Sequence, residues 1–230
     1  MSRYKILLFD ADRTLFDFDK AERLALCEAL LASNVEPTSE LVSAYTKIND
    51  SLWRALEKGQ IDRDTLKIRR FELLAERFSL SCDAEALAKE YIESLSEKTC
   101  LIDGAEELLS ALFGKVRMYI VTNGNARVQR RRYELSTISR FFEDIFISEE
   151  IGADKPSVEF FECVASRISD FSAEDALIIG DSLSSDIKGG INFGIDTCWF
   201  SPAEKDCGDD VPTYIVRDLS QIFDIVLGGD

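Results

Sequence analysis

Short apolar runs, each followed by polar or turn-forming residues, constrain the fold of this chain more than any other feature. A run without alternating polar residues is typical of a strand buried on both faces of a parallel sheet. We expect strands at residues 6–9, 118–121, 145–147, 176–179 and 197–200. Segments with helical spacing separate the later strands, at residues 126–135, 158–168 and 184–193. This alternation predicts an α/β fold with right-handed crossovers and a doubly wound parallel sheet.

Residues 19–98 have a different pattern, because they contain no strand-like run and their apolar residues recur at intervals of three and four. Pro37 and Gly59 interrupt the pattern, so we expect about four helices. A helical insertion directly after the first strand predicts a cap over the carboxyl edge of the sheet, where open α/β sheets bind ligands. The expected division is a core of residues 1–18 and 99–230 and a helical cap domain of residues 19–98.

The charge and the termini limit the partners. The 27 basic and 43 acidic residues give a formal net charge of −16, which repels nucleic acids and anionic membranes. No segment has the length of a membrane-spanning helix, and the N-terminus runs into the first strand without the apolar stretch of a signal peptide. We therefore expect a cytoplasmic protein that binds neither a nucleic acid polymer nor a membrane. The sequence does not indicate an oligomeric state.

The absence of histidine narrows the chemistry. Without histidine the chain cannot form a Ser-His-Asp or Cys-His catalytic site, nor the usual zinc spacings. The six cysteines form no CxxC pair, and we expect reduced thiols. Acid–base chemistry must therefore come from carboxylates, lysine or tyrosine.

Aspartates follow two of the expected strands. Asp10 and Asp12 come directly after the first strand, and both side chains would point to the same side of an extended backbone. Alone, such a pair is also common in exposed loops. Asp181 follows a second strand after Gly180, and Asp186 lies five residues later. Carboxylates from two strand ends suit Mg²⁺, which binds phosphate oxygens together with one or two carboxylates, so the sequence predicts a magnesium site.

Two further strand-end groups suit an anionic ligand. Thr122 and Asn123, before Gly124, close the strand at residues 118–121 and offer a hydroxyl and main-chain N–H groups. Lys155, before Pro156, supplies positive charge in an acidic protein. A lysine and a divalent cation would offset the repulsion between an attacking carboxylate and a phosphate group. The combination favours phosphoryl transfer.

These four motifs, in this order and each after an apolar strand, resemble those of the haloacid dehalogenase superfamily. The resemblance extends from Phe9 to about Pro202 and implies a Rossmann-like core. It implies that Asp10 is the nucleophile, which becomes an aspartyl phosphate, and that Asp12 is the acid–base residue. It also implies that Thr122, Asn123 and Lys155 bind the phosphate. The implied ligands of Mg²⁺ are Asp10, Asp181 and the main-chain carbonyl of Asp12, and Asp186 would support these ligands.

One residue departs from the family pattern. Arg13 follows Asp12 where many relatives have glycine, which puts the geometry of this turn in doubt. Dehalogenases of the superfamily lack the second aspartate of this motif. The presence of Asp12 therefore favours phosphoryl chemistry.

The local strings at residues 10–19 and 194–202 are similar to those of the bacterial pyrimidine 5′-nucleotidase subgroup. This resemblance implies a small phosphorylated metabolite as substrate, with a nucleoside monophosphate as the leading candidate. Alternative substrates are phosphoglycolate and a sugar phosphate, and a phosphosugar mutase is a further alternative. A phosphate-binding regulatory protein without turnover is disfavoured, because such proteins usually lack the nucleophile or a metal ligand.

Some bulky residues have two interpretations. Phe16, Phe18 and Trp53 are candidates for stacking on a base, but such residues are more often part of a core or domain interface. Arg69 and Arg70 are candidates for contacting a sugar or phosphate, but an adjacent pair on a helix more often faces solvent.

Overall fold

The structure is a computed structural model that describes residues 2–203 and 206–228. The chain forms two compact units. The sheet unit contains the chain up to Phe18 and from Thr99 onward, and the helical unit is Asp19–Lys98. The role of the helical unit as a cap stays a prediction.

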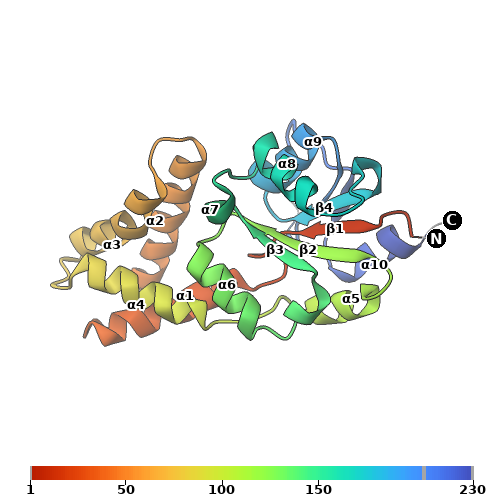
Figure 1. The fold of residues 1–230 in the computed structure, drawn as a ribbon. Coiled ribbons are helices and arrows are strands. Elements are labelled where there is room, and N and C mark those ends of the chain that lie inside the picture. Colours follow the sequence, from red (N-terminus) through yellow and green to blue (C-terminus); the bar gives the residue numbers. More distant parts are fainter. Residues whose placement is uncertain (1, 204–205, 229–230) are drawn as a thin grey trace. The chain divides into compact units, whose positions relative to one another are not determined.

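The sheet unit is built on six parallel strands (Figure 1). The strands are β1 (Ile6–Phe9), β2 (Arg117–Thr122), β3 (Asp144–Ile147), β4 (Ala176–Gly180), β5 (Asp196–Phe200) and β6 (Tyr214–Val216). Their order in the sheet is β3-β2-β1-β4-β5-β6. The predicted α/β class with a parallel, doubly wound sheet is confirmed. Because β1 lies between β2 and β4, the carboxyl ends of these three strands are neighbours.

Both faces of the sheet are covered, which explains why the strands read as uninterrupted apolar runs. The helices of this unit are α5 (Ala105–Leu112), α6 (Ala126–Leu135), α7 (Ser148–Ile151), α8 (Val158–Arg167), α9 (Lys188–Phe193) and α10 (Ser220–Leu227). Leu7 and Phe9 of β1 pack with α5 and α10 on one face, whereas Ile6 and Leu8 pack with α8 on the other. A π-helical turn, Leu183–Ile187, precedes α9 and accounts for the first part of the helix expected at residues 184–193.

Five of the strands lie where the apolar runs predicted them, whereas β6 was not predicted. This strand has three residues at the edge of the sheet, and its middle residue, Ile215, is exposed. A short edge strand has little apolar pattern to detect.

The helical unit contains α1 (Phe18–Ala32), α2 (Ser39–Glu57), α3 (Arg63–Phe78) and α4 (Ala84–Ser96). Side chains of Thr38, Asp62 and Asp83 accept N–H groups at the starts of α2, α3 and α4, which satisfies donors that a helix leaves unpaired. The rings of Tyr45, Phe71 and Tyr91 pack together in the interior, with centroids 5.3 to 5.6 Å apart.

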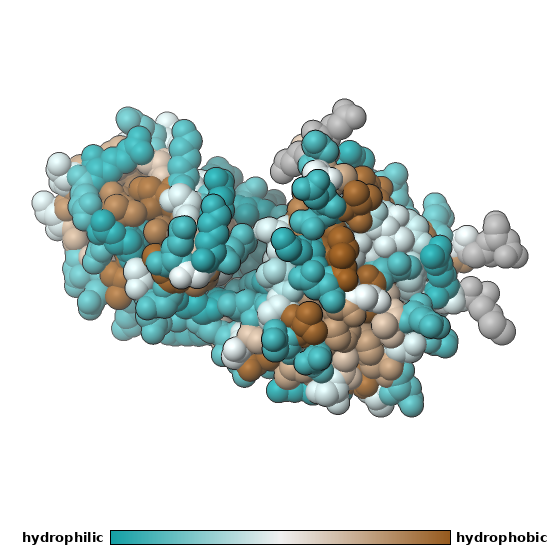
Figure 2. All heavy atoms as spheres, turned by 90° about the horizontal axis from the view of Figure 1, so that it is seen from above, coloured by the Kyte–Doolittle hydropathy of each residue, from teal (hydrophilic) through white to brown (hydrophobic). Residues whose placement is uncertain are grey.

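The surfaces of both units are rich in hydrophilic residues on the face drawn in Figure 2, with apolar atoms in smaller areas. Among the described residues, no helix combines the length and the apolar character that crossing a membrane requires. All six cysteines lie in the described part of the chain and are free thiols.

Candidate active site

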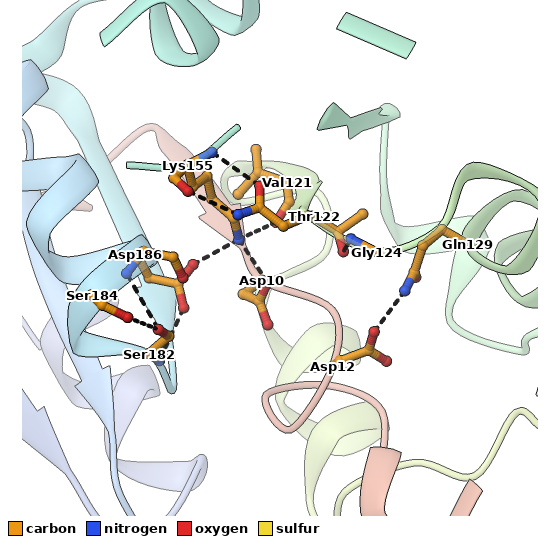
Figure 3. Close-up of polar contacts among 12 residues, drawn as sticks. Asp10, Asp12, Val121, Thr122, Gly124, Gln129, Lys155, Ser182, Ser184 and Asp186 are labelled. Atoms are coloured by element: carbon orange, nitrogen blue, oxygen red, sulfur yellow. Dashed lines mark hydrogen bonds and ion pairs between the residues drawn. The ribbon is translucent and has the colours of Figure 1, made fainter. Parts of the chain in front are cut away.

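The predicted site residues come from neighbouring strand ends of the sheet unit (Figure 3). Asp10 follows β1, Thr122 ends β2 and Asp181 follows β4. Lys155 lies between α7 and α8, and its side chain reaches the end of β1. The strand order therefore brings together groups that are up to about 170 residues apart in the sequence.

Lys155 connects these groups. Its Nζ donates to Asp10 Oδ1 at 2.6 Å, to Asp186 Oδ1 at 2.6 Å and to the main-chain oxygen of Val121 at 2.7 Å. Only 2% of Lys155, 7% of Asp10 and 1% of Asp186 is exposed, so water screens these ion pairs poorly. All three donors of the ammonium are used, which fixes its position against the proposed nucleophile.

The site has more negative charge than Lys155 can balance. Burial raises the pKa of Asp10 well above its usual value, Lys155 opposes this shift, and Asp186 and Asp181 add to it. Burial lowers the pKa of Lys155, but Asp10 and Asp186 outweigh that effect and the pKa is raised. Burial and then Asp186 raise the pKa of Asp181 to about 7, against the opposing charges of Arg13 and Lys155. An additional cation would relieve this repulsion.

The donor set fits such a cation. Carboxylate oxygens of Asp10, Asp181 and Asp186 lie within 4.8 Å of one another. Buried oxygen ligands of this kind suit Mg²⁺. The geometry thus includes Asp186 among the possible direct ligands, whereas the sequence resemblance implied a supporting role. The carboxylate of Asp12 is not part of this cluster, and the predicted ligand from Asp12 is its main-chain carbonyl.

Gly180 allows Asp186 to approach the site. A Cβ atom on Gly180 would lie 2.2 Å from Asp186 Oδ2, which is too close for any side chain. The N–H of Ser182 donates to the same oxygen at 3.1 Å. The loop after β4 therefore needs a glycine for close packing against a carboxylate.

Asp12 points toward a different element. The chain bends at Ala11, and the Asp12 carboxylate accepts Gln129 Nε2 at 2.6 Å and Arg132 Nη1 at 2.5 Å (Figure 3 draws the Gln129 contact). Both partners belong to α6. The two aspartates therefore face separate partners instead of forming the side-by-side pair expected of an extended backbone.

The two polar residues at the end of β2, Thr122 and Asn123, make different contacts. The Thr122 hydroxyl is buried and accepts the N–H of Gly124 at 3.1 Å. The Asn123 side chain donates to the main-chain oxygen of Lys155 at 2.8 Å and accepts its N–H at 2.9 Å. The side chain of Asn123 thus holds the backbone of Lys155, and a role of Asn123 in phosphate binding stays a prediction.

Arg13 adopts the conformation that glycine would favour. Its φ is 64°, in the left-handed region, and its guanidinium carbon lies 5.2 Å from the centroid of the Phe18 ring. The turn therefore forms despite the departure from the family pattern, at a conformational cost of about 1 kcal/mol.

The aromatic candidates for base stacking have other partners within their units. Phe16 is 1% exposed and lies 4.3 Å from the guanidinium carbon of Arg132. Trp53 is partly buried and faces Arg63 at 6.0 Å. Phe16 is thus a core residue, as its alternative interpretation held.

The two adjacent arginines differ. Arg69 forms ion pairs with Glu72 at 2.9 Å and Glu76 at 3.0 Å, on the partly exposed face of α3. Arg70 is 4% exposed and donates to Asn49 Oδ1 at 3.1 Å. The solvent-facing interpretation suits Arg69 and is wrong for Arg70, because the helix turns Arg70 into the interior.

Gln129 and Arg132 were not among the predicted site residues, although the sequence pattern indicates that Arg132 is buried. Both lie on the expected helix, and Arg132 follows the apolar Val128 by four residues, which places the two on one helix face. A buried position for Arg132 could have been inferred from this spacing.

The chain is similar to known hydrolases over nearly its whole length. The family model described as haloacid dehalogenase-like hydrolase matches residues 7–200. The chain is 37% identical to the pyrimidine 5′-nucleotidase PynA of Streptococcus pneumoniae, over 96% of this chain and 94% of PynA. It is 33% identical to the pyrimidine 5′-nucleotidase YjjG of Escherichia coli, over 94% and 95%. A crystal structure of YfnB from Bacillus subtilis, bound to magnesium, matches with a TM-score of 0.94 and 43% identity, covering 98% of this chain and 99% of YfnB.

Proposed function

We propose that this chain, which belongs to the haloacid dehalogenase-like hydrolase family, is a Mg²⁺-dependent phosphatase that hydrolyses small phosphomonoesters through a phosphorylated Asp10. The superfamily resemblance predicted from the sequence is confirmed, and with it the prediction that the chain is an enzyme. One observation carries the proposed mechanism. Lys155 Nζ contacts both Asp10 and Asp186, in a buried cluster with three carboxylates.

The first half-reaction transfers the phosphoryl group. Asp10 attacks phosphorus, and the bond to the ester oxygen breaks with its electron pair on that oxygen, which takes a proton from Asp12. The Thr122 hydroxyl donates to one phosphoryl oxygen, and Lys155 binds another by exchanging one of its three present contacts. The carboxylates of Asp10, Asp181 and Asp186, with the main-chain carbonyl of Asp12, would hold Mg²⁺, which supplies charge that offsets the repulsion between carboxylate and phosphate.

The second half-reaction restores Asp10. Asp12 takes a proton from a water molecule as the water oxygen attacks phosphorus, and the bond between phosphorus and the Asp10 oxygen breaks, which releases inorganic phosphate and restores the carboxylate. Asp12 ends this step protonated, as it began the first one. One side chain can thus serve both half-reactions.

Substitution of Asp10 tests the mechanism. Asp10→Asn should lower Mg²⁺-dependent phosphate release by ~10³-fold or more, because the amide cannot form the intermediate. Asp103→Asn, which changes an exposed aspartate of the same unit, should retain wild-type activity. A wild-type protein that binds phosphate without turnover would instead indicate a regulatory protein.

The proposed substrate is a nucleoside 5′-monophosphate, with pyrimidine nucleotides preferred. The support is similarity over nearly the whole chain to two proteins named as pyrimidine 5′-nucleotidases. A panel of uridine, thymidine and purine monophosphates, phosphoglycolate and sugar phosphates should give the highest kcat/KM with a pyrimidine nucleotide. Preference for phosphoglycolate by ~10-fold or more would contradict this substrate. An isomerised sugar phosphate without free phosphate would identify a mutase.

A further inference from the structure

The α6 contacts of Asp12 form a defined arrangement that the proposed reaction leaves unexplained. Gln129 Nε2 donates to Asp12 Oδ2 at 2.6 Å, and Arg132 Nη1 donates to Asp12 Oδ1 at 2.5 Å. Each carboxylate oxygen is therefore held by a different side chain. We call Gln129 and Arg132 the α6 clamp.

Burial shows that the α6 clamp is not an incidental surface contact. Arg132 has no exposed surface, and Gln129 is 2% exposed. Removing a guanidinium from water costs several kcal/mol unless a counter-charge and hydrogen bonds compensate it. The Asp12 carboxylate provides that counter-charge for Arg132.

Packing fixes both members of the α6 clamp. The guanidinium carbon of Arg132 lies 4.3 Å from the centroid of the Phe16 ring, a cation–π distance. Gln129 fills the space beside Gly124, where a Cβ atom would lie only 2.2 Å from Gln129 Nε2. Because the two residues are three apart on α6, they present their side chains on one face of the helix.

The chain also ties the α6 clamp to the phosphate-binding residues. The Asn125 side chain accepts the N–H of Val128 at 3.2 Å and caps the start of α6. Asn125 lies three residues after Thr122, the last residue of β2. The clamp and Thr122 therefore belong to one strand, loop and helix. Movement of α6 relative to β2 is restricted by this short connection.

We propose that Gln129 and Arg132 are positioning residues that orient the Asp12 carboxylate for proton transfer with the leaving group. This inference rests on the proposed function, because it needs Asp12 as the proton donor. A carboxylate has about four lone-pair sites, and the α6 clamp uses one on each oxygen. Asp12 can therefore donate its proton to the ester oxygen while both clamp contacts remain in place, and the carboxylate that results pairs in charge with Arg132.

The leaving group separates a positioning role from a structural one. Alkyl phosphates release a basic alkoxide that needs a proton, whereas 4-nitrophenyl phosphate releases a stable phenolate that needs little help. The constant kcat/KM reports events up to formation of the aspartyl phosphate, so later hydrolysis of the intermediate does not affect it. The ratio of the kcat/KM values for alkyl and aryl esters thus measures how well Asp12 delivers its proton.

The experiment compares Arg132→Met, Arg132→Lys and Gln129→Met with the wild type, using uridine 5′-monophosphate, phosphoglycolate and 4-nitrophenyl phosphate with Mg²⁺. Arg132→Met should lower kcat/KM for the alkyl esters by ~10²-fold, the usual effect of misplacing a catalytic group by about 1 Å. The value for 4-nitrophenyl phosphate should change by less than ~3-fold. Arg132→Lys should restore part of the loss, and Gln129→Met should give a loss of ~10-fold.

Arg131→Met is the matched control, because Arg131 lies on the same helix and is exposed. It should leave the ratio unchanged. Should Arg132→Met fail to fold, as judged by circular dichroism, Gln129→Met provides the same test without removing a buried charge. A parallel loss for all three esters, an unchanged ratio, or a gain in activity would overturn the positioning role. A wild type that hydrolyses none of the esters would overturn the proposed function itself, and the inference with it.

Discussion

Each unit of the molecule buries a polar cluster, and the two clusters differ in their balance of charge. In the helical unit, Asn49 connects Glu22, at 2.7 Å, to Arg70, at 3.1 Å, so that one carboxylate meets one guanidinium. In the sheet unit, Lys155 contacts the carboxylates of Asp10 and Asp186, and Asp181 adds a third carboxylate to the cluster. Both clusters are almost completely buried, except for Asp181, which is partly exposed.

The surroundings of the two clusters also differ. The guanidinium carbon of Arg70 lies 4.8 Å from the centroid of the Tyr91 ring and 5.2 Å from that of Phe71, in the aromatic interior of the helical unit. The cluster of the sheet unit lies where strands end, beside the carbonyl of Val121 in β2 and the N–H of Ser182 after β4. A buried cluster with matched charges is suited to holding helices together, whereas one with excess charge is suited to binding an ion.

The strongest test of this contrast is Lys155→Met. The substitution leaves Asp10 and Asp186 buried without their counter-charge and removes the proposed contact to the transferring phosphoryl group. We expect kcat/KM to fall by ~10³-fold and the free energy of unfolding without Mg²⁺ to fall by about 3 kcal/mol or more. Phosphate release and urea unfolding measure the two effects.

Lys5→Met is the control for Lys155→Met, because Lys5 forms an ion pair with Asp175 while its side chain is 72% exposed. Exposed pairs contribute little to stability, so both activity and unfolding should stay near wild type. Retention of activity in Lys155→Met would contradict the proposed mechanism.

The second test is Arg70→Met in the helical unit. It leaves Glu22 and Asn49 buried with fewer partners, so we expect the free energy of unfolding to fall by about 3 kcal/mol. The kcat/KM of the folded enzyme should change by less than ~3-fold, because we expect this charge-balanced cluster to stabilise the helical unit without contacting the substrate. Arg69→Met, on the exposed face of the same helix, should have a small effect on both. A selective rise in KM for nucleotides with Arg70→Met would instead support a substrate contact.

The contrast also shows which features the sequence could predict. Strands β1 to β5 were predictable because both faces of the sheet are covered, as the opposite packing of Leu7 and Leu8 shows. Asp10 and Asp181 were predictable candidates because they follow such strands, and parallel strands end at the same edge. These inferences need only the chain order and the identity of apolar residues.

The direction of single side chains was harder to predict. Arg130, Arg131 and Arg132 are consecutive, yet only Arg132 is fully buried, because the rotation of α6 against its neighbours decides which arginine points inward. Arg69 and Arg70 present the same problem on α3. The divergence of Asp12 from Asp10 depends on the bend at Ala11 and on partners more than 100 residues away.

The third test, Gly180→Ala, perturbs the ion site without removing a charge. The added methyl group would overlap Asp186 Oδ2, so the carboxylate must move away from Asp10 and Asp181. We expect Mg²⁺ affinity, measured by isothermal titration calorimetry, to fall ~10- to 100-fold. Gly59→Ala is the control, because Gly59 has a φ of 66° but open space around its Cβ position. It should reduce stability by about 1 kcal/mol and leave Mg²⁺ affinity unchanged.

The smallest expected effect is a change of stability with pH that originates in the carboxylate cluster of the sheet unit. The pKa of Asp181 is raised to about 7 in the folded protein, from an ordinary value of 3.8, by burial and by Asp186. Between these values the unfolded chain has lost the proton that the folded protein retains, so Asp181 makes the metal-free protein less stable as pH rises from about 4 to 7. Mg²⁺ binds ionised carboxylates and should therefore stabilise the protein more at pH 7 than at pH 5.

Thermal unfolding in EDTA and in Mg²⁺, at several pH values, measures this difference. The gain in Tm on adding Mg²⁺ should increase with pH, by several degrees across this range. Asp181→Asn should reduce the increase, because asparagine does not titrate and Asp10 then remains as the carboxyl with a raised pKa, whereas Arg70→Met should lower Tm in EDTA and in Mg²⁺ alike. A gain in Tm that is independent of pH in the wild type would mean that the carboxylates are already ionised without the metal, and that Lys155 balances their charge without a second cation.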